Sequence, residues 1–323
     1  MNYKLLGNTG VKVSSLCFGT MTFGAQADES VSAALYRRCR EVGINFFDCA
    51  DVYAHGRSEE ILGGLVAGER DQIVLTSKFY GGTGEDVNAR GGSRFHIRQA
   101  VEASLRRLKT DRIDIYFIHH FPAELPLENV LRSLDDLVRD GKILYPAASN
   151  FAAWQLAKAL GVAAWRGLTR FEVIQPMYNL VKRQAEVEIL PLAQAENLGV
   201  ISYSPLGGGL LSGKYGPRQR PEVGRLVENA MYQARYGQEW VYEVAADFTA
   251  FAQGRGYDPA ALAVAWVAGH PAVTAPIIGA RSLEQLEGSL KSLEIKMDDA
   301  LRAEVSALSP TPPPATDRLE EQV

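Results

Sequence analysis

The amino-acid sequence predicts an α/β protein folded as a (β/α)8 TIM barrel, with long loops after the third and seventh strands. Two observations carry this prediction. Short apolar segments rich in β-branched and aromatic residues recur eight times, and segments with helical spacing of apolar residues separate them. Segments that are apolar at nearly every position suit parallel strands buried on both faces. Eight such β–α units in one sheet close into a barrel.

The eight expected strands are too short to be helices. In chain order they are SLCFG (15–19), INFFD (44–48), IVLTSK (73–78), IDIYFIH (113–119), KILYPAAS (142–149), FEVIQ (171–175), VISYS (200–204) and APIIG (275–279).

Several of the intervening segments carry helix-boundary signals. The segment SVSAALYRRCREVG is expected to begin at an N-cap, Ser30, and to stop at Gly43. The segment at 127–141 is amphipathic and also ends in glycine. In DPAALAVAWVAG, Asp258 is expected to cap the helix and Pro259 to occupy its first turn.

A doubly wound sheet is the competing arrangement, and it would need a glycine-rich turn after an early strand to bind a nucleotide. The chain contains no GxGxxG, and SLCFGTMTFG is too sparse in glycine for that role. We therefore expect one barrel domain over residues 1–308. The tail at 309–323 is Pro-rich and polar, so it is expected to be disordered.

Two connections are long, and both leave the C-terminal ends of strands. One covers 79–96, and the other, of about seventy residues, includes the glycine-rich and basic stretch 207–240. Since barrel active sites lie at that end, both loops are expected to cover the active face.

Composition narrows the function classes. The net charge of −4 and pI near 5.8 argue against a nucleic-acid-binding surface. No apolar run approaches the roughly 18 residues that span a membrane, and MNYKLLGNTG lacks the apolar core of a secretory signal. The three cysteines, Cys17, Cys39 and Cys49, show no CxxC spacing, which indicates a reducing compartment and a cytoplasmic location.

Nearly every expected strand ends in a polar residue, and barrel chemistry is assembled from strand ends. A single such residue would be uninformative, but this many converging on one rim predict an active site. In chain order they are Asp48, Lys78, His119, Ser149, Asn150, Gln175 and Ser204, followed after the last strand by Gly279 and Arg281.

Asp48, Tyr53, Lys78 and His119 suit proton transfer to or from a carbonyl or alcohol oxygen. A free tyrosine has a pKa near 10, which a neighbouring ammonium group would lower. A carboxylate would keep that lysine charged, and a histidine would orient the substrate oxygen. No activated serine or cysteine nucleophile is evident. A metal site is not expected, because the His and Asp residues available lack a ligand spacing such as HxxxH.

These residues resemble the catalytic tetrad of the aldo-keto reductases. DxxxxY contains Asp48 and Tyr53, LTSK ends at Lys78, and YFIHH contains His119. The segments LGNTGVKVS, GTMTFG, DVYAHGRSEEILG, SNF, IQPMYN, YSPLGGGLLSGKY and IIGARSLEQL agree in order and spacing, from about residue 3 to about 293. Within the family, the chain looks closer to the bacterial branch and to the members similar to potassium-channel β-subunits than to the aldose-reductase branch.

The resemblance implies a role for each matching residue. Tyr53 would be the general acid in reduction, tuned by Lys78 and Asp48, while His119 would orient the carbonyl. The implied cofactor-binding residues are Gly19, Thr20, Met21, Asp48, Ser149, Asn150, Gln175, Tyr203, Ser204, Pro205, Leu206, Gly208, Leu210, Lys214, Ile278, Gly279, Arg281 and Gln285. The expected substrate pocket is lined by Met21, Phe23, Tyr53, Phe79, His119 and His120.

The expected cofactor is NADPH rather than NADH. Arg281 precedes Ser282, an expected helix N-cap, and a helix N-terminus with a guanidinium suits a ribose 2′-phosphate. Two positions depart from the family pattern: Gly288 and Ser289 stand where relatives often carry Glu-Asn, which puts the adenine contacts in question. GGLLSGK matches GxxxxGK, but Tyr215 follows where a P-loop needs Ser or Thr.

The predicted function is that of an NADP(H)-dependent oxidoreductase that reduces an aldehyde or ketone, or runs the reverse reaction, on a small-molecule substrate. The alternative is a catalytically weak NADPH-binding regulatory subunit, like the channel β-subunits. The absence of a long N-terminal extension favours the enzyme. No nucleic-acid or membrane partner is expected, and the sequence does not choose between a monomer and a homo-oligomer.

Overall fold

The computed structural model describes residues 1–316, 318 and 320. Within them, eight parallel strands form a closed barrel in the spatial order β10-β3-β4-β5-β6-β7-β8-β9, which confirms the predicted fold. The barrel strands are β3 (Cys17–Gly19), β4 (Phe46–Asp48), β5 (Val74–Phe79), β6 (Ile113–Ile118), β7 (Ile143–Ser149), β8 (Val173–Gln175), β9 (Gly199–Ser202) and β10 (Ala275–Ile278).

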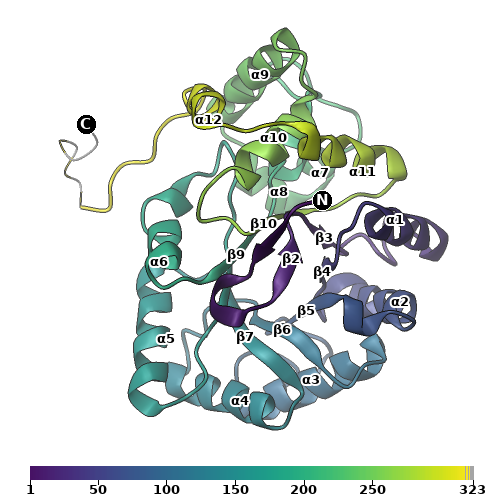
Figure 1. The fold of residues 1–323 in the computed structure, drawn as a ribbon, viewed down its shortest axis with the longest axis vertical. Helices are drawn as coiled ribbons and strands as arrows, with labels where there is room; N and C mark the ends of the chain where they lie inside the picture. The colour runs from purple at the N-terminus through teal and green to yellow at the C-terminus, as the bar shows by residue number, and fades with distance from the viewer. Residues whose placement is uncertain (317, 319, 321–323) are drawn as a thin grey trace.

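A helix follows each barrel strand and packs on the outside of the barrel (Figure 1). These helices are α1 (Glu29–Glu41), α2 (Arg57–Val66), α3 (Arg94–Leu108), α4 (Leu127–Arg139), α5 (Ala153–Arg166), α6 (Ile189–Ala195), α10 (Pro259–Ala268) and α11 (Leu283–Leu290).

The helix ends follow their capping residues, with one correction. Helix α1 begins two residues earlier than Ser30 predicts, because the Asp28 side chain accepts a 2.8 Å hydrogen bond from the Val31 amide. Asp258 caps α10 with Pro259 in its first turn, and Ser282 caps α11, as the sequence predicts.

The core has two layers, which the alternation of side chains along each strand separates. On β6, Ile115 and Phe117 point into the barrel. Tyr116 and Ile118, between and after them, pack against the surrounding helices. The same alternation decides which strand-end residues can reach the active face.

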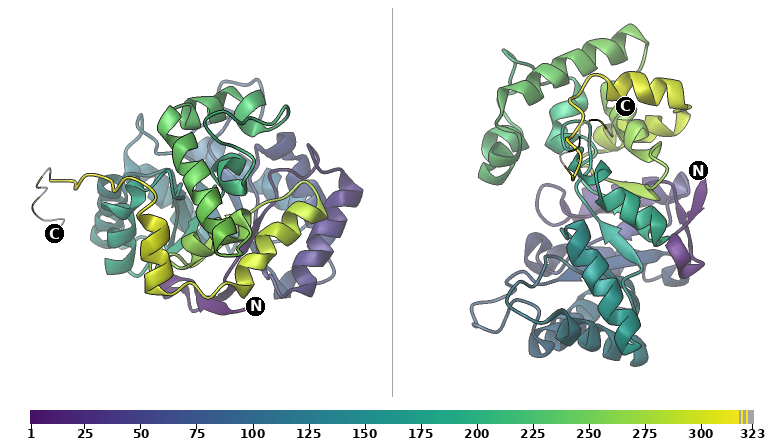
Figure 2. Two further views of the ribbon diagram at one scale, coloured as in Figure 1. Left: turned by 90° about the horizontal axis from the view of Figure 1, so that it is seen from above. Right: turned by 90° about the vertical axis from the view of Figure 1, so that its left-hand side faces the viewer.

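A two-stranded antiparallel hairpin, β1 (Tyr3–Leu5) and β2 (Lys12–Ser14), lies across the barrel at one end. Leu6 and Val13 are fully buried there, in contact with the interior layer, so they close the N-terminal end of the barrel. Figure 2 (right) shows this purple hairpin and the green helices of the long insertion at opposite ends of the molecule.

The long connection after β9 contains three additional helices, α7 (Arg225–Glu228), α8 (Ala230–Tyr236) and α9 (Glu239–Gly254). A final helix, α12 (Asp299–Ser306), precedes the C-terminal segment. The predicted tail at 309–323 includes positions 317, 319 and 321–323, which lie outside the described residues. Its disorder stays a prediction.

Candidate active site

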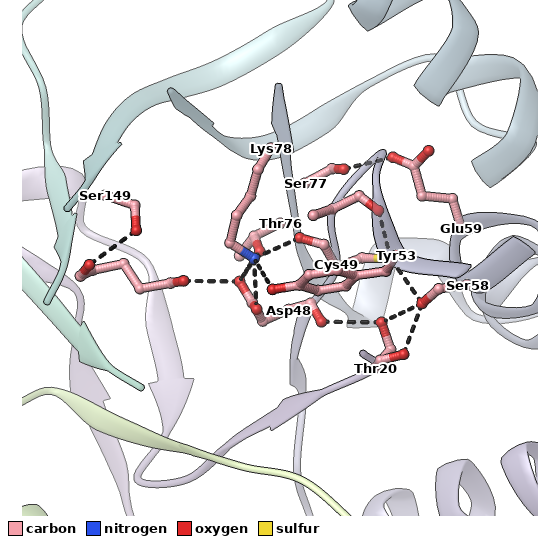
Figure 3. A network of polar contacts seen from close by, with 12 residues as sticks. Thr20, Asp48, Cys49, Tyr53, Ser58, Glu59, Thr76, Ser77, Lys78 and Ser149 are labelled. Carbon is pink, nitrogen blue, oxygen red and sulfur yellow. Dashed lines mark hydrogen bonds and ion pairs between the residues drawn. The ribbon is translucent and has the colours of Figure 1, made fainter. Parts of the chain in front are cut away.

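The four residues of the predicted tetrad meet at the C-terminal ends of β4, β5 and β6. Asp48 ends β4, Lys78 is the next-to-last residue of β5, and His119 follows β6. Tyr53 begins a short turn after β4, and its hydroxyl lies 3.4 Å from Lys78 Nζ. Figure 3 shows Tyr53, Lys78 and Asp48 pointing toward one another.

The buried carboxylate of Asp48 is saturated with hydrogen bonds. Its Oδ1 accepts from Thr76 Oγ1 (2.7 Å), Lys78 Nζ (2.8 Å) and Gln175 Nε2 (2.9 Å), and its Oδ2 accepts from Lys78 at 2.7 Å. Lys78 also donates to the Cys49 carbonyl at 2.6 Å. A buried ion pair is held only when its remaining donors and acceptors are satisfied, and here they are. Lys78 therefore has one fixed position below Tyr53.

The charges of this pair set the protonation of the tyrosine. Burial alone would lower the pKa of Lys78, but the charges of Asp48 and Tyr53 raise it above its ordinary value. Burial raises the pKa of Tyr53 to about 12, and the nearby Lys78 opposes that rise without cancelling it. Lys78 therefore lowers the tyrosine pKa, as expected, but desolvation is the larger effect and the net shift is upward. Tyr53 is a neutral phenol at pH 7, the form that can donate a proton.

His119 faces Tyr53 across the rim. The two rings meet edge to face, with centroids 6.3 Å apart. Burial, followed by the charge of Lys78, lowers the pKa of His119 to about 3, so its imidazole is neutral and can donate only one N–H. The ring of His120 stacks on it at 5.2 Å. The Asn150 amide donates to the His119 carbonyl at 2.9 Å, which ties the end of β6 to the end of β7.

This arrangement offers two neutral hydrogen-bond donors above a fixed ammonium. A carbonyl oxygen placed against them would be polarised, and proton donation from Tyr53 would leave a phenolate beside Lys78. That phenolate is stabilised by the ammonium at close range.

Cys49 is not available for redox chemistry at this site. The thiol is fully buried, lies 3.2 Å from Ser58 Oγ, and has its pKa raised by burial to about 12. Thiolate is the reactive form, so Cys49 is a packing residue.

The other half of the rim is formed by the turns after β9 and β10. Gly207, Gly208 and Gly209 have φ values of 58°, 70° and 101°, the left-handed region that glycine adopts without strain. Such consecutive turns form concave backbone surfaces that suit anions. Among the described residues, Lys214, Arg225 and Arg281 have no acidic ion-pair partner.

The two arginines lie close enough to Lys214 to affect it. Burial, then Arg281 and Arg225, lower the pKa of Lys214. The N-terminus of α11 adds its own positive end beside Arg281, whose amide donates to Gln285 Oε1 at 3.2 Å. Open glycine backbone, three unpaired cations and a helix N-terminus fit a dinucleotide with several phosphates.

The structure places some of the predicted pocket residues elsewhere. Phe79 points outward from β5 and stacks on Tyr116 with centroids 5.1 Å apart. Phe23 packs against Phe18 at 5.8 Å. Both phenylalanines are fully buried among the residues between barrel and helices, so neither is exposed at the rim. Met21, in contrast, is 37% exposed.

Other predicted residues lie at the strand ends. Gly19 and Gly279 pack at the β3–β10 seam, where a Cβ on Gly279 would lie 3.5 Å from the Gly19 carbonyl. The hydroxyl of Tyr203 donates to Asn150 Oδ1 at 2.7 Å, so β9 joins the same hydrogen-bonded rim.

Three basic residues near the rim were not predicted from the sequence: Lys182, Arg225 and Arg235. They lie in loops and in the helical insertion, where no motif identifies them. A surface hollow of about 700 Å³ between α1, α2 and α3, lined by Arg57, Glu60 and Arg107 among others, contains no tetrad residue. The site is therefore defined by the convergence of strand ends, not by the size of a hollow.

The closed barrel and the Tyr–Lys–Asp–His set at its C-terminal rim define a barrel protein equipped to transfer a proton to an oxygen atom. The chain belongs to the aldo/keto reductase family, whose model matches residues 15–309. Members of this family generally bind NAD(P)H, and the relatives support a carbonyl-reducing oxidoreductase.

Three relatives illustrate the range of the family. An uncharacterized oxidoreductase, YrpG, of Bacillus subtilis is 36% identical over 97% of both chains. A probable voltage-gated potassium channel subunit beta of Arabidopsis thaliana is 36% identical over 91% of this chain and 92% of its own. Norsolorinic acid reductase stcV of Emericella nidulans is 34% identical over 90% of this chain and 76% of its own.

In the part of the chain that the structure describes, no helix combines the length and the apolar character needed to cross a bilayer.

Proposed function

We propose that this protein is an NADPH-dependent carbonyl reductase, which reduces an aldehyde or ketone to an alcohol and can run in reverse. The observation that carries the proposal is Lys78 Nζ at 3.4 Å from the Tyr53 hydroxyl, with both Asp48 oxygens holding the ammonium in place.

In the proposed reaction, a bound nicotinamide cofactor supplies the hydride. His119 orients the substrate oxygen through its single N–H. Tyr53 gives its phenolic proton to that oxygen as negative charge develops. Lys78 stabilises the phenolate left behind, and Asp48 keeps Lys78 charged and fixed. In the reverse direction, the phenolate takes the proton from the alcohol.

The preference for NADPH is supported by the cation set. Lys214, Arg225 and Arg281 would hold the phosphates, with Arg281 and the N-terminus of α11 at the 2′-phosphate. An acidic residue at that place would instead favour the ribose hydroxyls of NADH. Gly288 and Ser289, on α11, offer shorter side chains than Glu-Asn for adenine contacts. A cytoplasmic location stays a prediction, supported by three unpaired buried thiols.

A regulatory NADPH-binding subunit is the second candidate, because relatives named as channel β-subunits match over most of this chain. Turnover separates the two. Purified protein is mixed with NADPH and a panel of aldehydes and ketones, and NADPH absorbance is followed. We expect oxidation well above the blank for some of them. Tight NADPH binding with no oxidation across the panel would contradict the reductase and favour the regulatory role.

A further inference from the structure

Two cations outside the tetrad lie over a stacked pair of tyrosines at the rim. Tyr232 and Tyr236, both on α8, have ring centroids 6.4 Å apart and nearly parallel planes, at 20°. The Arg235 guanidinium carbon lies 5.6 Å from the centre of the Tyr232 ring, and Lys182 Nζ lies 5.7 Å from that of Tyr236. Both distances are within the range of cation–π attraction.

Hydrogen bonds tie this pair to the active site. The Asn179 amide donates to Tyr236 Oη at 3.1 Å and to the Ser204 carbonyl, just after β9, at 2.9 Å. Tyr203, the preceding residue, donates to Asn150, which in turn donates to the His119 carbonyl. Tyr236 is thus fixed relative to the tetrad, and the two cations that contact the tyrosine pair lie near the active site.

The charge of Arg235 affects the pKa values of groups on the substrate side of the rim. After burial, it is the next cause that lowers the pKa of both His120 and Lys182, and it opposes the burial-driven rise in the pKa of Tyr203. His120 is itself stacked on His119. Arg235 therefore lies near the groups that a substrate bound at Tyr53 and His119 would meet next.

No acid neutralises this pair within the described residues: neither Arg235 nor Lys182 forms an ion pair or a side-chain hydrogen bond there. Two partly buried cations that repel each other carry an electrostatic cost, which a bound anion would remove.

We propose that Arg235 and Lys182 bind an anionic group, a carboxylate or a phosphate ester, carried by the carbonyl substrate. The guanidinium of Arg235 suits a planar or tetrahedral oxyanion, and Lys182 adds a point charge. This inference rests on the proposed reductase function and narrows its substrate class to aldehydes or ketones with a negative charge.

The cations proposed to bind the cofactor phosphates lie close to Arg235 and Lys182. The test must therefore separate an effect on substrate binding from an effect on cofactor binding. Arg225 also contacts the Tyr232 ring, at 5.6 Å, and acts on Lys214. Arg235 and Lys182 do not act on Lys214. Cofactor affinity is therefore measured for every variant beside substrate kinetics.

The experiment uses two matched substrate pairs with the full-length protein and NADPH. One pair is 4-carboxybenzaldehyde and its neutral methyl ester, and the other is glyceraldehyde 3-phosphate and glyceraldehyde. We expect the charged member of at least one pair to have the higher kcat/KM, and the pair that shows the preference names the anion as carboxylate or phosphate.

Arg235→Gln and Lys182→Gln should each lower kcat/KM for the charged substrate by about 10- to 100-fold, since each removes one charge-assisted contact. Turnover of the neutral substrate and the Kd for NADPH should change by less than about twofold. That change is smaller than the effect of losing one charge-assisted contact. Arg235→Lys should retain more of the preference than Arg235→Gln. Arg218→Gln, an exposed cation on the same insertion, is the matched control and should leave the preference intact.

Three results would overturn the inference. Equal kcat/KM for charged and neutral members of both pairs would refute it while leaving the reductase function standing. A loss of NADPH affinity in Arg235→Gln that equals its loss of kcat/KM would assign the arginine to the cofactor. No turnover of any of the four substrates, with NADPH bound, would count against the reductase function itself.

Discussion

The two halves of the rim differ in how their charges are matched. On the β4–β5 half, Asp48 and Lys78 neutralise each other and every oxygen of Asp48 has a donor. On the β9–β10 half, Lys214, Arg225 and Arg281 have no acidic partner among the described residues, and the backbone between them runs through three left-handed glycines.

The difference indicates which half is complete within the protein. The proton-transfer half is preorganised, with its groups held in place before any ligand binds. The other half carries positive charge that only an anionic ligand can match. Substitutions in the first half should therefore reduce the rate or the stability of the fold, whereas those in the second should reduce ligand affinity.

Tyr53→Phe should give the largest effect and tests the first half. We expect turnover to fall by about 10²- to 10⁴-fold, because the variant keeps the ring and loses the phenolic hydroxyl beside Lys78. The Kd for NADPH should stay within about twofold. The variant loses the contact between the Tyr53 hydroxyl and the Lys78 ammonium, and cofactor binding does not need that contact. Steady-state kinetics and fluorescence titration measure the two quantities. Unchanged turnover would refute the role of Tyr53.

Lys78→Met should reduce both turnover and stability. It leaves the Asp48 carboxylate buried and uncompensated, which costs about 3–5 kcal/mol of unfolding free energy. Urea unfolding measures this loss. The double variant Lys78→Met with Asp48→Leu should be destabilised by less than the sum of the two single changes. Additive losses would contradict a direct coupling between the two charges.

Arg281→Ala tests the second half and should leave the fold intact, because the side chain is exposed. The Kd for NADPH should rise by about 10- to 100-fold, the size of a charge-assisted contact to phosphate. The Kd for NADH should change little. Isothermal titration with both cofactors measures the ratio, and equal losses for the two would count against recognition of the 2′-phosphate.

Asp51→Asn should give the smallest effect. It changes a carboxyl group next to the β4–β5 half of the rim. Both oxygens of the buried Asp51 carboxyl lack a hydrogen-bond partner, and burial, then Glu59, raise its pKa to about 7. Since the folded-state pKa lies above the unfolded value near 3.9, this group's stabilising contribution is present below pH 4 and lost as pH rises through 7.

Relative to wild type, Asp51→Asn should therefore gain about 1–3 kcal/mol of stability between pH 5 and pH 8. Urea unfolding at the two pH values measures this gain. Glu85→Gln, a change at an exposed loop position, is the control and should show no such gain. A difference between Asp51→Asn and wild type that is the same at both pH values would mean that Asp51 does not titrate in this range.

The sequence predicted the features that local patterns encode. Buried parallel strands leave continuous apolar runs, so the barrel strands were found within about two residues of their ends. Features set by three-dimensional register were not predictable. Phe79 follows Lys78, so it faces the helices when Lys78 faces the interior. The three-residue strands of the N-terminal hairpin are too short to show a period.

The net direction of the Tyr53 pKa shift was not predicted from the sequence, for a related reason. The sequence places a lysine near the tyrosine, but it does not report how completely the phenol is removed from water, and that burial determines the net direction of the pKa. Arg225 and Arg235 lie on short insertion helices, where periodicity gives no orientation. Only the contacts of α8, such as the hydrogen bond from Asn179 to Tyr236, bring Arg235 near the rim.

The seam of the barrel joins two strands that are far apart in the sequence, β3 and β10. Cys17 and Phe18 pair with Ile277 and Ile278, about 260 residues later. A chain emerging from the ribosome can therefore assemble the barrel strands β3 to β9 but cannot close the ring until β10 has been synthesised. Contacts of such long sequence separation slow folding and leave strand edges exposed in the meantime. Strand β10 is thus the one that covers the free edges of β3 and β9, which could otherwise pair with a neighbouring nascent chain.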